Sequence, residues 1–363
     1  MKGKRGIIIA GGLVGILSVL LVHYGSPENA GGSGFCMACF FKEMVGSIGL
    51  YRTAVFQYIK PEILGLILGA FLLSLKNEEF ELRGGFSPLA RFMLGIVVMI
   101  GSSIFLGCSM GMTLRLGGGD LNAIFGVLGF VFGVFIAVQF LKKGFSLKRT
   151  YKMIKLEGRN FLIVTIGLSV LFLAYPIFML FNKFELGPLF LPLIISLIIG
   201  TAVGALAQKT RLCIVAGARD LILFKDKRIL FGFASIVVFS LIVNLIYGHF
   251  NLGFENQTVA HTESLWNFLG MVLVGWGSVL LGGCPFRQLI LAGEGDIDAV
   301  VTVIGLVVGA IISYNFGIAA SVEGTTTYGR IAVIICFILL GIISYINSED
   351  LVKVKHEQEE ITL

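Results

Sequence analysis

Ten long and nearly uninterrupted apolar runs constrain the fold of this chain more than any other feature. They lie at 6–24, 61–75, 92–107, 120–141, 161–181, 188–206, 229–247, 264–281, 296–314 and 328–346. A bilayer core about 30 Å thick is crossed by a helix of roughly 20 apolar residues, so most runs suffice for a span. Because 56% of the residues are hydrophobic and only 14% are charged, no room remains for a sizeable soluble domain. We predict an all-α polytopic membrane protein with nine or ten transmembrane helices.

Basic residues are spread unevenly over the loops between these runs. If the N-terminus is cytoplasmic, 22 of the 28 Lys and Arg residues fall in cytoplasmic segments, seven of them in the loop 142–159. Cytoplasmic loops carry such an excess, so we expect both termini in the cytoplasm and 347–363 as a cytoplasmic tail. The first run resembles a secretory signal, but no persuasive cleavage site follows, and we interpret it as a retained helix. The net charge of +6 then reflects topology and contact with anionic lipid headgroups, and it does not indicate nucleic-acid binding.

The two halves of the chain repeat each other. A shift of 176 residues matches seven residues in order, among them Cys108 with Cys284, and a shift of 177 matches Cys36 with Cys213. Each half holds five apolar runs, an odd number, so the second copy enters the membrane from the opposite side. We therefore predict two inverted repeats, 6–181 and 188–346, within a single integral membrane domain over 1–363. Inverted repeats are common in secondary transporters, where interrupted helices form a site near the midplane.

The four repeated cysteines lie in segments that are poor spans. Residues 31–49 and 211–224 are short and partly polar, which predicts re-entrant helices that dip into the membrane and return. The other two cysteines break the third and eighth runs, with Gly or Pro beside them. Helix N-termini aimed at the midplane favour an anion, and polarizable thiols suit a sulfur or selenium oxyanion. No lysine or arginine needs to sit there, and a permanently buried cation would hold a dianion too tightly for release.

Two further cysteines have simpler interpretations. Cys39 forms a Cys-x-x-Cys with Cys36, a spacing found in redox and metal sites. Its counterpart in the second repeat is Ala216, and no histidine cluster accompanies it, so the sequence gives little support to either use. Cys336 fits a small buried apolar residue. We predict neither a metal nor a cofactor.

Charged residues and glycines also recur at matching positions. Lys42-Glu43 and Arg219-Asp220 either neutralise each other where dipping helices reach the interface, or present Lys42 and Arg219 as entrance electrostatics for an anion. Two repeated aspartates of Gly-x-Gly-Asp turns are expected to cap helices, namely Asp120 and Asp296. Close helix packing is expected at matching Gly-x-x-x-Gly pairs, Gly129/Gly133 and Gly305/Gly309.

The segments around the cysteines also carry a resemblance to a known family. Their motifs are Phe-Cys-x-x-x-x-x-Lys at 35–42, Leu-Gly-Cys-Ser-x-Gly at 106–111, Arg-Leu-Cys-Ile-Val-Ala-Gly-Ala-Arg-Asp at 211–220 and Gly-Gly-Cys-Pro-Phe-Arg-Gln-Leu at 282–289. Over nearly the whole chain these motifs resemble the YeeE/YedE family of sulfur-compound transporters, most closely the YedE-like branch assigned to selenium transport. That family is described with nine full spans plus dipping segments.

The resemblance implies a thiol-lined path through a bacterial cytoplasmic (inner) membrane. By motif, Cys36, Cys108 and Cys284 are implied as path residues that form S–H···S contacts to thiosulfate, and Cys213 as the pseudo-symmetric fourth. A small TusA-like sulfur-carrier protein is implied as a cytoplasmic partner.

The sequence thus favours a transporter, and not an enzyme, that takes up a small sulfur or selenium oxyanion such as thiosulfate. The thiols would pass the anion along by transient hydrogen bonds. Two hypotheses from other classes stay open: a membrane thiol oxidoreductase using Cys36-x-x-Cys39, and a structural scaffold for a sulfur-carrier protein. Thiosulfate and selenium compounds are not separated, because both are soft anions of similar size.

Overall fold

A computed structural model describes residues 4–25, 34–47, 49–51, 60–85, 87–147, 151–152 and 190–361. Its first-repeat helices are α1 (Lys4–Gly25), α2 (Met37–Ser47), α3 (Pro61–Lys76), α4 (Pro88–Phe105), α5 (Ser109–Gly118) and α6 (Asn122–Lys142). The later helices are α8 (Phe190–Thr210), α9 (Ile214–Phe224), α10 (Arg228–Ile246), α11 (Ser264–Leu280), α12 (Pro285–Gly293), α13 (Ile297–Asn315) and α14 (Thr327–Ile361). Two-residue strands, β1 (Arg83–Gly84) and β2 (Tyr151–Lys152), pair antiparallel.

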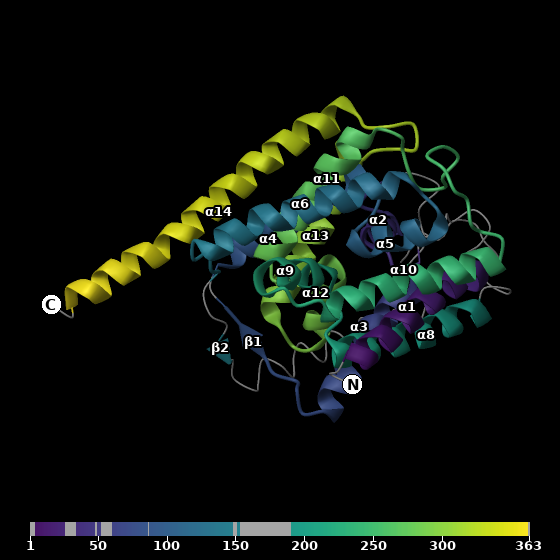
Figure 1. Cartoon of the computed structure of the whole chain (residues 1–363), viewed down its shortest axis with the longest axis horizontal. Coiled ribbons are helices and arrows are strands. Elements are labelled where there is room, and N and C mark those ends of the chain that lie inside the picture. Colours follow the sequence, from purple (N-terminus) through teal and green to yellow (C-terminus); the bar gives the residue numbers. More distant parts are fainter. Residues whose placement is uncertain are drawn as a thin grey trace.

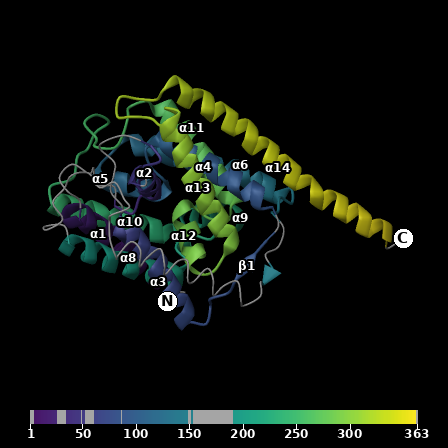
Figure 2. The same ribbon diagram turned by 180° about the vertical axis from the view of Figure 1, so that it is seen from behind.

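The predicted fold class is confirmed: the chain is an all-α polytopic membrane protein. Nine of the ten predicted apolar runs fall on a described helix, although one of these, α3, has only 16 residues and is not a candidate span. The run at 161–181 lies outside the described residues. In the described part of the chain, eight helical segments are long and apolar enough to cross a membrane. The predicted tail continues α14 as far as Ile361, and Figures 1 and 2 show this helix projecting past the others.

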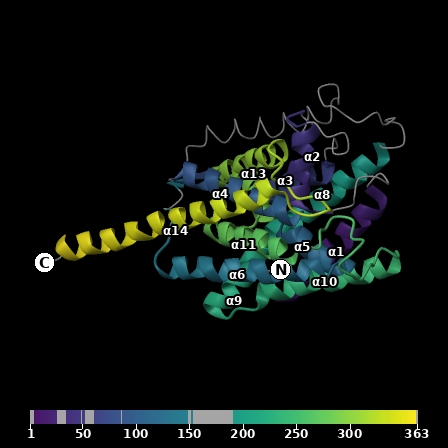
Figure 3. The same ribbon diagram turned by 90° about the horizontal axis from the view of Figure 1, so that it is seen from above.

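The long helices form two groups of four with short helices between them (Figures 1 and 3). The first group contains α1, α3, α8 and α10, and the second contains α4, α6, α11 and α13. Within each group the most extensive contacts join the two repeats: α1 packs on α10, α3 on α8, α4 on α13 and α6 on α11. The short helices α5, α9 and α12 each contact both groups. The short helices therefore occupy the interface between the groups.

Helix directions show that the repeats are inverted. Gly101 of α4 lies against Gly270 of α11, whereas Val98 lies against Gly277, so these two corresponding helices run antiparallel. The pairs formed between repeats run parallel, as on α3 and α8, where Gly65 and Gly69 face successive turns of the partner. Equivalent helices that point in opposite directions are what an inverted duplication requires.

Glycines bring the paired helices into backbone contact. A Cβ at Gly129 would overlap the carbonyl oxygen of Phe268, and one at Gly305 would overlap that of Phe92. The same arrangement occurs on α3 and α8, where Gly204 packs on the Leu66 carbonyl. Small residues drive helix association in lipid because close approach increases van der Waals contact. The predicted role of the Gly-x-x-x-Gly pairs is confirmed.

Candidate functional site

Each repeated cysteine stands immediately before a short helix. Cys36, Cys108, Cys213 and Cys284 precede α2, α5, α9 and α12, and the carbonyl of each accepts the first helical hydrogen bond. All four residues are buried and carry free thiols. The predicted dipping segments and helix breaks are thus four copies of one local structure, with a thiol at the N-cap.

A left-handed turn precedes each thiol. The residue two positions earlier has a positive φ in every case, and these residues are Gly34, Leu106, Arg211 and Gly282. Three of the turns close a preceding helix with a bond from the following amide to a carbonyl five residues back, namely Gly107 to Ser102, Leu212 to Ala207 and Gly283 to Ser278. This is the Schellman arrangement, which usually places Gly in the left-handed position. A leucine or arginine there costs about 1–2 kcal/mol, so packing holds the thiols against local strain.

The cysteines meet in two pairs, one from each repeat. We call Cys36 and Cys108 pair one, and Cys213 and Cys284 pair two. In pair one, the Cys108 Sγ accepts the backbone N–H of Met37 at 3.2 Å. In pair two, the Cys213 Sγ lies 3.9 Å from the Cys284 Sγ. The four cysteines lie at interrupted helices, as predicted, and the helices that carry them come together in pairs.

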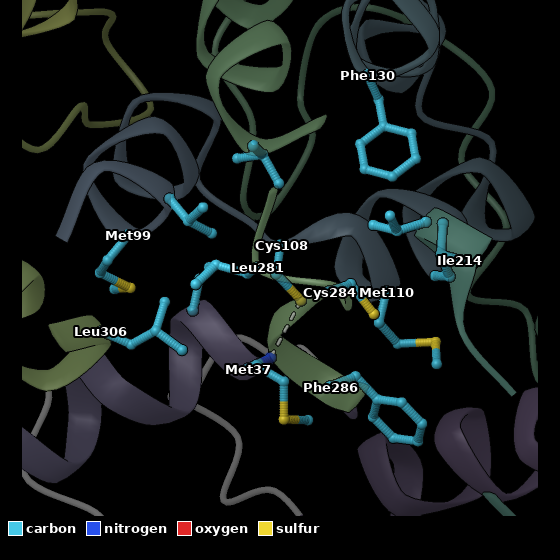
Figure 4. Packing of buried hydrophobic residues seen from close by; sticks show 14 of the residues in the cluster. Met37, Met99, Cys108, Met110, Phe130, Ile214, Leu281, Cys284, Phe286 and Leu306 are labelled. Atoms are coloured by element: carbon cyan, nitrogen blue, oxygen red, sulfur yellow. Dashed lines mark hydrogen bonds between the residues drawn. The ribbon is translucent and has the colours of Figure 1, made fainter. Parts of the chain in front are cut away.

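Residues from the first turns of all four short helices belong to one buried cluster. Met37, Met110, Ile214 and Phe286 come from α2, α5, α9 and α12, and each is at most 4% exposed. Figure 4 draws them together with Cys108 and Cys284, and its dashed line marks the Met37 contact to Cys108. The helix α12 of the second repeat also contacts α2 of the first. The two pairs therefore share one core.

The N-termini of these short helices favour negative charge. The N-cap residues Cys108, Cys213 and Cys284 make no side-chain cap hydrogen bond, although Ser, Thr, Asp or Asn would normally supply an oxygen here. The first amides of each helix are left with weak sulfur partners or none, at the positive end of the helix dipole. A soft anion can accept from these amides and contact the thiols at the same time.

The charged residues near the thiols differ in part from the prediction. Arg219 and Asp220 do pair, at 2.9 Å, and Asp296 does cap α13 by accepting the Ala299 amide. Glu43 also pairs with Lys60 at 3.3 Å, and the Lys42 ammonium lies over the Tyr314 ring while it acts electrostatically on Glu43. Lys60 is 17 positions from Glu43 in the sequence, so local spacing could not indicate this additional pair.

The expected cap of α6 at Asp120 is displaced by one residue. Leu121 is the N-cap, while Asp120 accepts the Asn122 amide and pairs with Arg115 at 2.6 Å. The aspartate still organises the turn, as the Gly-x-Gly-Asp pattern indicates, but through a side-chain turn and an ion pair.

A basic residue does lie near the thiols of pair two, although the predicted mechanism needs none there. Arg287, which charge counting placed in a cytoplasmic segment, lies in the first turn of α12 and is 8% exposed. Its guanidinium interacts electrostatically with Cys213. The sequence does contain an indication of this ion pair, since Glu294 lies seven residues after Arg287 and therefore on the same face of the helix.

Most of the second repeat also matches a known sequence-family model. Residues 209–345 match a family model described as sulphur transport. The match spans α9 to α13 and most of the apolar part of α14, and so contains both cysteines of pair two. It supports a transporter of a sulfur compound, and with the eight candidate spans it indicates a multi-pass membrane protein. No curated protein matches the chain.

Cys39 and Cys336 differ in their surroundings. The Cys39 Sγ donates to the Cys36 Sγ at 2.8 Å, whereas Cys336 is buried in α14, as predicted. Over the described residues, no group of three or more His, Cys, Asp or Glu side chains could hold a metal ion. The chemistry that the described thiols and helix termini support is reversible contact with a soft anion.

Proposed function

We propose that this chain belongs to the YeeE/YedE family and takes up a small sulfur- or selenium-containing oxyanion, such as thiosulfate. The observation that carries the proposal is the set of four buried thiols, each at the N-terminus of a short helix and paired within its own repeat. This arrangement offers thiol contacts and helix-dipole attraction from both repeats. The sulphur-transport match over 209–345 supports the cargo class, and the motifs favour the selenium-associated branch.

In the proposed mechanism the anion passes between the pairs by transient S–H contacts, without covalent intermediates. Cys36, Cys108, Cys284 and Cys213 line its path. Weak sulfur contacts bind the anion enough to replace part of its hydration, yet let it leave, which conduction requires. Lys42 and Arg219, which lie at the middle of α2 and of α9, raise the local anion concentration at the two entrances.

The membrane setting completes the proposal. The protein lies in a bacterial cytoplasmic membrane, in contact with lipid, with both termini in the cytoplasm, where a small TusA-like carrier receives the product. The path needs no cofactor, and the chain acts as a transporter and not as an enzyme.

Uptake by proteoliposomes tests the proposal directly. Purified protein is reconstituted, and accumulation of labelled thiosulfate or selenite is compared with empty vesicles. Cys108→Ala and Cys284→Ala are expected to lower uptake at least tenfold, and the matched control Cys336→Ala, also buried but remote, is expected to leave it unchanged. Accumulation at the empty-vesicle level for both anions would overturn the cargo assignment. Full activity of Cys108→Ala would favour a structural scaffold.

A second candidate function rests on the 2.8 Å contact between Cys36 and Cys39. A membrane thiol oxidoreductase would use these two residues as its dithiol. Under that hypothesis Cys39→Ser abolishes activity, while the Cys108 and Cys284 variants retain it.

A further inference from the structure

The two repeats differ at one position beside the thiols. The shift that aligns Cys108 with Cys284 aligns Gly111 with Arg287. Gly111 packs directly on pair one, because a Cβ there would lie 2.9 Å from the Cys36 Sγ. The equivalent position in the second repeat carries a guanidinium instead, which interacts electrostatically with Cys213.

Arg287 is buried together with the carboxylate of Glu294. Its Nη1 lies 3.0 Å from one Glu294 carboxylate oxygen, and its Nη2 lies 3.4 Å from the other. The side chains of Arg287 and Glu294 are 10% and 9% exposed. Neither the Nη1 nor the facing Glu294 Oε1 has a well-aligned hydrogen bond, so the pair is held by charge without full hydrogen bonding.

A second arginine, Arg83, also lies close to Glu294. The Arg83 Nη2 lies 3.7 Å from the Glu294 carboxylate, and the Arg83 side chain is 35% exposed. The backbone of this segment is fixed on the end of α12, because the Arg83 amide donates to the Gly295 carbonyl at 3.2 Å. Glu294 therefore lies between a buried guanidinium beside the thiols and a more exposed one near the surface.

The position of Arg287 allows it to reach an anion held by pair two. Its backbone amide interacts with the Cys284 sulfur and its guanidinium with Cys213. A guanidinium presents two parallel N–H groups that match two oxygens of one anion. Thiosulfate has three oxygens at one end and a soft terminal sulfur at the other, so both ends find a partner.

We propose that Arg287 is an anion-binding, specificity-determining residue of pair two, and that Glu294 is the carboxylate it releases when the oxyanion arrives. The inference rests on the proposed transport function. On arrival of the oxyanion, Glu294 shifts toward Arg83 and one anion replaces another at Arg287. When Glu294 returns, the oxyanion is displaced. This exchange removes the difficulty of a permanently buried cation, because the guanidinium is never without a counterion.

The test compares single and double variants in the same proteoliposomes. Arg287→Gln alone leaves Glu294 buried and unpaired, which is strongly destabilising, whereas removing both charges of a buried pair is often tolerated. The informative variant is therefore the double change Arg287→Gln with Glu294→Gln. We expect it to fold and to raise the KM for labelled thiosulfate at least tenfold. The matched control, Arg228→Gln with Asp226→Asn, removes an exposed pair and leaves uptake unchanged.

A charge swap separates anion binding from structural support. Arg287→Glu with Glu294→Arg restores an ion pair but places a carboxylate beside the thiols. A structural role predicts recovery of uptake, and the exchange proposal predicts none. Glu294→Gln alone is expected to lower the KM and the turnover together, since nothing then displaces the bound anion.

Selectivity and binding measurements complete the test. Sulfate, which lacks the soft sulfur, and hydrosulfide, which lacks the oxygens, are both expected to compete weakly with thiosulfate in the wild type. The double Gln variant should lose the preference over hydrosulfide. If the wild type transports thiosulfate and the double variant keeps its KM, the inference fails while transport stands. If the wild type transports nothing, yet thiosulfate raises its melting temperature only when Arg287 is present, the proposed function fails and the anion site stands.

Discussion

Pair one and pair two share the same local backbone pattern but have different chemical surroundings. Both are built from a left-handed turn, an N-cap thiol and a short helix, and both join two helices of one repeat. Pair one has a third thiol, Cys39, against Cys36 and a glycine beside it. Pair two has Ala216 and Arg287 at the equivalent positions. The two repeats thus share the geometry of the thiols and differ in the residues beside them.

Under the proposed function, the two pairs bind the same oxyanion with different strength. A buried guanidinium lies in the first turn of α12 at pair two, whereas the basic residues that act electrostatically on pair one, Lys42 and Lys60, lie outside the first turns of α2 and α5. This difference would give the path a direction, because an anion that moves from pair one to pair two gains Arg287 as a charge partner and must then be displaced to leave. The predictions below remove the differences between the pairs one at a time.

The largest effect is expected from making pair one resemble pair two. Gly111→Arg forces a Cβ to within 2.9 Å of the Cys36 Sγ, and overpacking of this kind costs about 1–3 kcal/mol. We expect thiosulfate uptake to fall at least tenfold, with a lower melting temperature. The control is Gly341→Ala on α14, where nothing lies within 4 Å of the added Cβ. Wild-type uptake by Gly111→Arg would show that close contact between α5 and Cys36 is not needed.

A smaller effect is expected from removing the additional thiol of pair one. Cys39→Ala deletes the 2.8 Å contact to Cys36 but leaves both path thiols of that pair in place. We expect uptake to change less than twofold, while Cys36→Ala lowers it at least tenfold. Equal loss in both variants would instead indicate that the two thiols act as a redox unit.

The smallest effect concerns a titratable residue in one of two equivalent loops. His261, in the loop between α10 and α11, is fully buried, its Nε2 lies 2.8 Å from the Ile104 carbonyl oxygen, and burial lowers its pKa. The equivalent loop at 77–87 has no histidine. Because the unfolded chain takes up a proton more readily, stability should fall as pH drops below the ordinary value of 6.5, by about 1.4 kcal/mol for each unit between the two pKa values.

The measurement is the melting temperature in detergent between pH 5 and 8. His261→Gln keeps a donor for the Ile104 carbonyl but cannot titrate, so its melting temperature should depend less on pH than that of the wild type. Glu263, Arg115 and Asp120 also act on the imidazole, and they are the same in both proteins. Parallel pH profiles would contradict the prediction.

The sequence was sufficient for the architecture because membrane spans and repeats leave long-range periodic signals. Apolar runs predicted the long helices, and the two shifts predicted which cysteines are equivalent. The left-handed turns were only partly visible: Gly34 and Gly282 indicate them, but Leu106 and Arg211 do not, since tertiary packing holds those residues in that conformation.

Ion-pair partners were the least predictable part. Charge counting treats each basic residue as solvated, and this assumption failed for Arg287 because a buried acid compensates it. Contacts across the repeats were equally hidden: His23 and His249 lie 226 residues apart, yet their ring nitrogens approach to 2.9 Å. Such partners follow from how the helices assemble, which no local pattern records.

The interleaving of the repeats has a consequence for biosynthesis. The glycine-rich face of α1 packs on α10, which emerges from the ribosome about 200 residues later, a delay of roughly 10–40 s at ordinary translation rates. Through that interval α1 lacks α10 and α4 lacks α13, and lipid or the insertion machinery must shield the faces that these pairs later bury. The two halves therefore mature together, and halves produced as separate chains should acquire their native packing only when both are present in one membrane.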